Sequence, residues 1–131
     1  MALEVHVVSP EREVWSGDAE MVVAKGVDGD VGILSGHAPM LVSLAVHPVR
    51  IKQGDQEHLI LVDGGFLHVT SGEGETRVDV LAEHAALPEE IDVAAARARA
   101  EELQTRVEGQ GDTRGRTELD KALMRARFGA G

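Results

Sequence analysis

Cysteine is absent from this chain of 131 residues, which excludes disulfide bridges, thiolate catalysis and cysteine zinc sites. Aromatic side chains are almost absent as well, because Trp15, Phe66 and Phe128 are the whole set. So few rings disfavour a stacking surface for bases or sugars. The hydrophobic core must therefore be built from Val, Leu, Ile and Ala.

An excess of positive charge is missing too, since the formal net charge is -10. This balance argues against nucleic acid as the main partner and against direct adhesion to anionic lipid. No apolar run approaches the roughly 20 residues that a membrane-spanning helix needs. The first residues also lack the basic and apolar regions of a secretory signal. We therefore expect a soluble, cytoplasmic protein of one or two small domains.

The first two thirds of the chain alternate between apolar and polar residues and are punctuated by glycine. Leu3, Val5 and Val7 fall on one face of a strand. Asp63-Gly64-Gly65 is typical of a tight turn between two strands. Further strands are expected over residues 14–16, 19–24, 39–53, 57–62, 66–70 and 77–81. Many short strands with frequent turns predict a β-sandwich or barrel over residues 1–87.

From Pro88 onward the alternation gives way to helical spacing. Apolar residues then recur at steps of 3, 4, 3 and 4, at Val93, Ala96, Ala100, Leu103 and Val107. This spacing predicts a helix with a narrow apolar seam.

A second helix is expected after the glycine-containing stretch 109–115. Its apolar face would consist of Leu119, Ala122, Leu123 and Ala126. Two helices joined by a short glycine loop predict an antiparallel α-helical hairpin over residues 88–131. Because alanine buries little apolar area, such a hairpin is marginal unless it leans on another surface.

The second helix is basic in an acidic protein. Residues 112–131 carry 5 basic and 3 acidic groups, and the basic ones are Arg114, Arg116, Lys121, Arg125 and Arg127. One reading is a solvated helix face. The other is an arm that docks on an acidic partner surface.

The stretch Gly26–Leu41 reads as a long loop shaped by glycine. It lacks the Gly-Lys-Ser/Thr of a phosphate loop, and the glycine and glutamate positions of a calcium loop are not filled. Asp28, Asp30 and His37 could be metal ligands, but no second histidine lies at ligand spacing. No nucleophile elbow or metal cluster indicates catalysis, so the residues alone indicate a protein-interaction module.

Four segments, however, resemble the epsilon subunits of bacterial F-type ATP synthases: Val8–Gly17, Gly29–Leu41, Asp63–Val69 and Val80–Glu83. The second is similar to that family's G-[DE]-x-G-[IV]-L-P-G-H-A-P-L-L pattern. The resemblance implies a sandwich of about ten strands followed by a helical hairpin. It also implies a non-catalytic central-stalk subunit without a cofactor, peripheral to the cytoplasmic face of the cell membrane, and a hairpin that blocks ATP hydrolysis when extended.

The resemblance also implies partners and contact residues. Asp30, Ser35 and His37 would contact the c-subunit ring or the gamma subunit. Arg114, Arg116, Lys121, Arg125 and Arg127 would reach the alpha and beta subunits. The membrane would be reached only through the complex.

Two departures from the family pattern bear on function. Ser35 stands where the family usually has proline, so φ is no longer pre-set there. Some relatives bind ATP through an I/L-D-x-x-R-A motif, which here places Asp92 at the acidic position but Ala95 at the arginine position. Without that guanidinium the bidentate phosphate contact is lost. An ATP-sensing hairpin therefore remains the alternative function.

Overall fold

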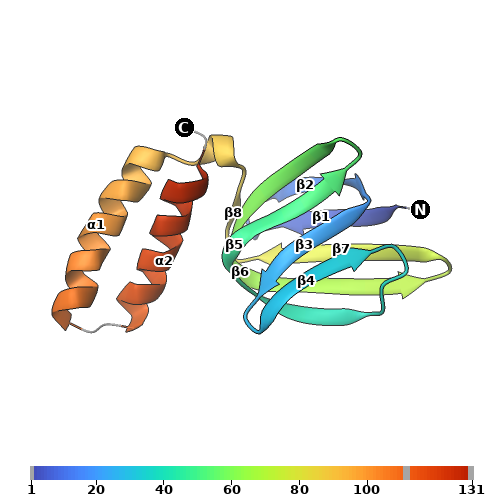
Figure 1. Cartoon of the computed structure of the whole chain (residues 1–131), viewed down its shortest axis with the longest axis horizontal. Coiled ribbons are helices and arrows are strands. Elements are labelled where there is room, and N and C mark those ends of the chain that lie inside the picture. The colour runs from blue at the N-terminus through green and yellow to red at the C-terminus, as the bar shows by residue number, and fades with distance from the viewer. Residues whose placement is uncertain (1, 111–112, 130–131) are drawn as a thin grey trace. The chain divides into compact units, whose positions relative to one another are not determined.

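The computed structural model describes residues 2–110 and 113–129, and the side chains of all of these except 106–110 and 113–117. The chain divides into two compact units, Met1–Ala86 and Leu87–Gly131. Figure 1 shows a β unit and a helical unit. No helix in the described part of the chain is both long and apolar enough to cross a membrane.

The β unit contains eight described strands in one hydrogen-bonded sheet. They are β1 Leu3–Val8, β2 Glu13–Ala19, β3 Met21–Gly26, β4 Gly29–Leu34, β5 Met40–Gln53, β6 Gln56–Gly72, β7 Glu75–Ala82 and β8 Ala85–Ala86. Their order is β2-β1-β7-β6-β5-β3-β4, and β8 pairs with β6. All pairs are antiparallel except β1 with β7. The predicted sandwich is confirmed.

The expected count of about ten strands differs from the eight observed because β5 and β6 are unusually long, at 14 and 17 residues. The predicted turn Asp63-Gly64-Gly65 is wrong, since these residues lie inside β6, where Asp63 and Gly65 pair with residues of β5. Their glycines have another purpose. At Gly65, where φ is 117°, a Cβ atom would collide with the carbonyl of Leu81 on β7. Glycine thus allows β6 to stay paired with both neighbours through a bend.

The core of the β unit is built from β-branched and leucine side chains, as the composition required. Leu3, Val5 and Val7 are fully buried, which confirms the predicted face of the first strand. Buried side chains of the other strands join them, including Val22, Ile33, Ile51, Ile60, Leu67, Val78 and Val80.

The segment Gly26–Leu41 is only partly a loop, which corrects the sequence-based interpretation. Residues 29–34 form β4, which pairs in antiparallel register with β3. Val31 and Ile33 carry the alternation that identifies a strand, and Ile33 is fully buried. The glycines of the segment hid that alternation.

The helical unit begins with a 3-10 turn, Pro88–Glu90, and continues with α1 Val93–Gln110 and α2 Thr113–Phe128. The predicted break at 109–115 is too long, because 109–110 and 113–115 are helical. Ala100, Leu103 and Ala122 form the buried contact between the helices, and Leu119 packs against it. Leu123 does not join them and is 47% exposed.

Candidate interaction surfaces

The structure separates the residues that were expected to form one contact. Asp30 lies near the start of β4, opposite Lys25 of β3, whereas Ser35 and His37 follow the end of β4. At about 3.3 Å per strand residue, the two places lie on the order of 15 Å apart. Asp30 and His37 therefore cannot share a metal ion or one small contact. Clusters of three or more potential metal ligands are absent from the residues that the structure describes.

Ser35 and His37 belong to a tight turn that is fixed to the β6–β7 hairpin. The amide of His37 donates to the carbonyl of Leu34 at 3.1 Å, and Gly36 between them has φ of 87°. This geometry is that of a type II turn with Ser35 at its second position. The Gly36 amide donates to Thr76 Oγ1 at 2.8 Å, and the Ser71 hydroxyl donates to the His37 carbonyl at 2.7 Å. The backbone is thus held in place.

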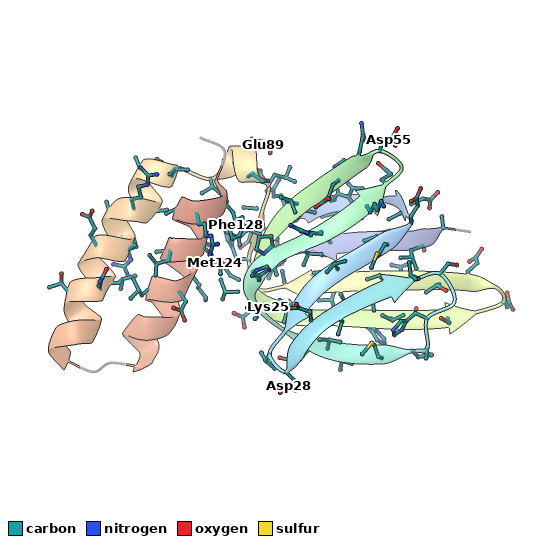
Figure 2. The ribbon with its side chains drawn as sticks, in the orientation of Figure 1. Lys25, Asp28, Asp55, Glu89, Met124 and Phe128 are labelled. Carbon is teal, nitrogen blue, oxygen red and sulfur yellow. The ribbon has the colours of Figure 1, made fainter. Side chains whose placement is uncertain are left out.

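Asp28 and Asp30 lie at the opposite end of the β3–β4 hairpin, where Figure 2 labels Asp28. They line a shallow hollow of about 280 Å³ together with Met40, Leu41 and Ser43 of β5. Asp30 therefore lies next to an exposed part of β5, and the acidic and apolar groups there can meet the same partner.

An exposed apolar row extends from this hollow across the sheet. We call Val27, Leu41, Phe66 and Leu81 the outer row; their exposed fractions are 62%, 65%, 49% and 50%. Phe66 of β6 pairs with Ser43 of β5 and with Leu81 of β7. The amide of Val27 donates to the Ser43 carbonyl at 2.9 Å, which places Val27 beside the residue of β5 that pairs with Phe66. A contiguous apolar strip of this kind typically marks a protein interface.

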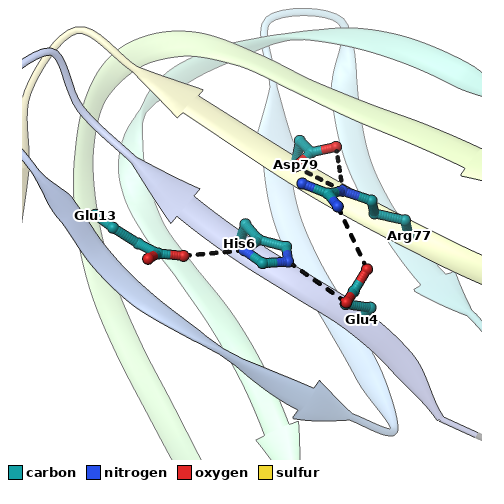
Figure 3. A network of polar contacts seen from close by, with 5 residues as sticks. All are labelled: Glu4, His6, Glu13, Arg77 and Asp79. Atoms are coloured by element: carbon teal, nitrogen blue, oxygen red, sulfur yellow. Dashed lines mark hydrogen bonds and ion pairs between the residues drawn. The ribbon is translucent and has the colours of Figure 1, made fainter.

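Figure 3 shows a network of charged side chains contributed by β1, β2 and β7. His6 of β1 pairs with Asp79 of β7, and Val8 pairs with Leu81 two residues further along the same strands. Because alternate residues of a strand share a face, Asp79 lies on the same face of the sheet as Leu81 of the outer row. The Arg77 guanidinium donates to both Asp79 carboxylate oxygens at 3.1 and 3.0 Å and reaches Glu4 at 3.5 Å. The hydrogen bond to Asp79, followed by the negative charges around it, raises the pKa of Arg77.

The basic side chains of α2 differ in how exposed they are. Lys121 is 19% exposed at its side chain and lies 3.6 Å from Glu118, and Arg125 is half-buried. The Arg127 guanidinium lies over the Phe128 ring, 5.5 Å from its centroid. The side chains of Arg114 and Arg116 lie outside the described residues.

Asp92, the residue that matched the ATP motif, is the N-cap of α1. Its Oδ1 accepts a hydrogen bond from the Ala95 amide at 3.0 Å. A cap of this type satisfies one of the free amides at the start of a helix. The carboxylate is thus already used within the helix.

The outer row and the charged network were both missed by sequence reasoning. Phe66 and Leu81 are each adjacent in sequence to a buried core residue, Leu67 and Val80. The alternation itself was the available signal, because a residue next to a buried strand position points to the opposite face of the sheet. An apolar residue at such a position is a candidate contact.

Known proteins match both units. A family model described as the β-sandwich domain of the ATP synthase delta/epsilon chain matches residues 2–102. An ATP synthase epsilon chain of Thermobifida fusca is 41% identical over 127 residues, which are 95% of this chain and 90% of that one. An epsilon chain of Brevibacillus brevis is 45% identical over 106 residues, 80% of this chain and 77% of that one.

A shorter relative and a solved structure complete the comparison. An ATP synthase epsilon chain of Frankia casuarinae is 52% identical over 88 residues, which are 66% of this chain but 99% of the Frankia chain. A chain in the cryo-EM structure of the Euglena gracilis mitochondrial ATP synthase, comprising OSCP, F1 and c-ring, has a TM-score of 0.76 at 21% identity, covering 94% of this chain and 76% of that chain. That likeness shows a shared fold.

Proposed function

Because the chain belongs to the delta/epsilon family of ATP synthase subunits, we propose that it is a non-catalytic rotor subunit of the central stalk. In this role it lies at the cytoplasmic face of the cell membrane and meets the membrane only through the complex. It connects the c-subunit ring to the catalytic alpha and beta subunits through gamma. The 41% identity to an epsilon chain across 95% of this chain carries the proposal.

The outer row is the surface that we assign to gamma. Its four side chains form the contiguous apolar strip of the described β unit, with Asp30 at one end. Burial of a strip like this against a partner removes apolar area from water and stabilises the complex. Asp30 at one end of β4 and the turn holding Ser35 and His37 at the other end are then separate contacts with the c ring or gamma.

Pull-down of the tagged chain from membranes tests this assignment. The intact chain should bring down gamma, alpha and beta. Phe66→Glu combined with Leu81→Glu should abolish their recovery, because each places a charge in the apolar contact. Leu123→Glu, at a similarly exposed leucine of α2, should leave recovery of gamma unchanged. Full recovery with the double variant would overturn the assignment to gamma.

Cross-linking separates the two contacts along β4. Because the chain lacks cysteine, one introduced cysteine is unique. Cysteine at Asp30 or His37 should cross-link to a c subunit or gamma in the assembled enzyme. Cysteine at Asp55, in the turn between β5 and β6, serves as the control and should react only with soluble reagents. Equal cross-linking from all three positions would contradict the assignment.

For the helical unit we propose a regulatory role in which the extended hairpin presents α2 to the alpha and beta subunits. Lys121 and Arg125 lie four residues apart on α2 and therefore share one helix face, which the extended hairpin would present to an acidic partner surface. Removal of residues 87–131 should raise ATP hydrolysis by the assembled enzyme. Lys121→Glu with Arg125→Glu should do so partly, and Arg99→Glu on α1 should not. Unchanged hydrolysis after truncation would show that the hairpin is not an inhibitor.

The alternative of an ATP-sensing hairpin has less support. Ala95 supplies no cation and the Asp92 carboxylate caps α1. We expect weak or absent ATP binding. Submicromolar binding measured by calorimetry would favour the ATP-sensing function over a hairpin that does not respond to ATP.

A further inference from the structure

One ring nitrogen of His37 is already used within the turn that follows β4. Nδ1 donates to the carbonyl oxygen of Ala38 at 2.7 Å. Because a carbonyl oxygen can only accept, this hydrogen bond requires the proton of the ring to be on Nδ1. Ala38 precedes Pro39, which restricts the backbone of Ala38 and so fixes the direction of its carbonyl. The chain itself therefore sets the tautomer of the neutral ring.

The other nitrogen, Nε2, is the group that the turn offers to a partner. With the proton on Nδ1, Nε2 of the neutral ring carries a lone pair and is a hydrogen-bond acceptor. It has no partner among the described residues, and it is not one of their buried polar atoms. The side chain of His37 is half-buried. Little rotamer freedom is then left to lose when a partner binds.

The backbone on both sides of the His37 ring is held by hydroxyl groups of the β6–β7 hairpin. On one side the Gly36 amide donates to Thr76 Oγ1 at 2.8 Å. On the other the Ser71 hydroxyl donates to the carbonyl of His37 at 2.7 Å. These bonds join segments 40 and 34 residues apart in sequence. The position of the ring therefore depends on two strands to which His37 does not belong.

Thr76 has a composition that core packing does not explain. The inward-facing residues of β7 are Thr76, Val78, Val80 and Ala82, and all four are buried. A buried hydroxyl is costly unless it forms a hydrogen bond, and valine has the same branched shape without that cost. The bond to the Gly36 amide is what threonine adds at this position. Its hydroxyl thus serves the turn rather than the core.

We propose that Ser71 and Thr76 are positioning residues that hold His37 so that its Nε2 accepts a hydrogen bond from a c subunit. The matching group of the c subunit is an N–H or O–H donor, and a carboxylate does not fit. This inference rests on the proposed function, in which the turn contacts the c ring or gamma. Ser71 is five residues along β6 from Phe66, about 16 Å at strand spacing. A partner on the outer row is therefore distinct from the partner at the turn, which we assign to the c ring.

Cross-linking in the assembled enzyme tests the acceptor role. Ser35→Cys places a thiol in the same turn and leaves the ring of His37 intact. Adding His37→Ala should lower the initial rate of cross-linking to a c subunit about fivefold, as for the loss of one hydrogen bond. His37→Gln keeps an acceptor and should retain most of the rate, whereas His37→Lys carries only donors and should lose as much as alanine. Cross-linking from Asp30→Cys, at the other end of β4, should be unchanged by all three.

A second set of variants tests the positioning roles. In the Ser35→Cys chain that also carries Ser71→Ala and Thr76→Val, His37→Ala should lower the rate by less than about twofold, because the ring is no longer held. Ser71→Thr with Thr76→Ser keeps both hydroxyls and should preserve the full fivefold effect. An equal effect of His37→Ala in all backgrounds would overturn the positioning roles. Recovery of gamma from the same membranes shows that each variant is folded and assembled.

The outcomes separate this inference from the proposed function. Failure of the intact chain to bring down gamma contradicts the proposed function. Recovery of gamma without any cross-link from Ser35→Cys to a c subunit overturns the c-ring contact of the turn, and the present inference with it. Cross-linking that His37→Ala leaves unchanged, or that His37→Lys retains, overturns the acceptor role alone. Nitrogen NMR of the full chain should show the proton of the neutral His37 ring on Nδ1, and a proton on Nε2 would also overturn that role.

Discussion

The β unit and the helical unit differ in how much large apolar surface each one buries. In the β unit Leu3, Ile33, Ile51, Ile60 and Leu67 are among many fully buried large side chains. In the described helical unit the contact between α1 and α2 consists of Ala100, Leu103 and Ala122, with Leu119 against it. At about 25 cal/mol per Å² of buried apolar area, alanine contributes little. The β unit therefore has its own stable core, whereas the described contact between the helices contains one fully buried leucine, Leu103, with Leu119 beside it.

This contrast fits the proposed function, in which the β unit is an anchor and the helical unit a moving element. Segments with few buried apolar contacts open at low free energy, as lids and switches must. The Frankia relative supports the same division, since a match of 88 residues covers 99% of it, a length close to that of the β unit alone. The proposed function needs such a β unit, because its contact with gamma has to persist while the hairpin moves.

The largest expected effect comes from shortening matched core leucines. Leu67→Ala should destabilise the β unit by about 2–5 kcal/mol, because it removes a fully buried side chain and leaves a cavity. Urea unfolding followed by Trp15 fluorescence measures the loss.

Leu103→Ala makes the same chemical change in the other unit. Helical circular dichroism should fall at a low urea concentration, with the Trp15 transition within about 0.5 kcal/mol of wild type. If Leu103→Ala lowers both transitions together, the two units unfold as one and the contrast fails.

Substitution of the adjacent glycines Gly64 and Gly65 should lower stability by a smaller amount, and only in the β unit. Gly65→Ala should cost about 2–3 kcal/mol, because φ is 117° and the new Cβ would meet the Leu81 carbonyl. Gly64→Ala, at φ of 95° but with ordinary van der Waals contacts of 3.9 and 4.0 Å around the Cβ, should cost less. The difference in urea midpoints isolates the close approach of β6 and β7. Equal losses would mean that backbone conformation alone requires glycine there.

The fold was predictable where the residue pattern has one physical interpretation. Alternation of Leu3, Val5 and Val7 has only one buried face, and the steps between Ala96, Ala100 and Leu103 fit only a helix. The interpretation failed where glycine has two uses. At Gly64 and Gly65 glycine permits a bend within a strand rather than a turn between strands, and only the position of β7 decides between them.

The interaction surfaces were less predictable because they arise from pairing between strands. The outer row joins Leu41, Phe66 and Leu81 through the registers of β5, β6 and β7, which a local pattern cannot supply. Likewise, Asp30 and His37 are close in sequence, but a strand between them keeps them apart. Their closeness in sequence suggested one shared contact. An extended strand, however, increases the distance between residues by more per position than a compact loop does.

Loss of the cap on α1 should affect the helical unit alone. Asp92→Ala removes the acceptor of the Ala95 amide and should destabilise the hairpin by about 1 kcal/mol. Asp92→Asn preserves an acceptor and serves as the control. The midpoint temperature of thermal unfolding, followed by helical circular dichroism, should be lowered only by Asp92→Ala. The Trp15 transition should stay unchanged in both variants. A shift in the Trp15 transition would show coupling between the units.

The smallest effect should be a gain in stability at the turn after β4. Ser35 occupies the second position of a type II turn, where proline's fixed φ is favourable, and Leu34 before it is already in an extended strand. Ser35→Pro should raise the stability of the β unit by about 0.4–1 kcal/mol, chiefly by restricting the unfolded chain. Gly36→Ala, at φ of 87°, should lower it by about 1 kcal/mol. The Trp15 transition in urea should therefore move in opposite directions for the two variants, with helical circular dichroism unaffected by either. A loss of stability with proline would mean that the serine amide or its φ is needed in this turn, and that the family's proline occupies a different geometry.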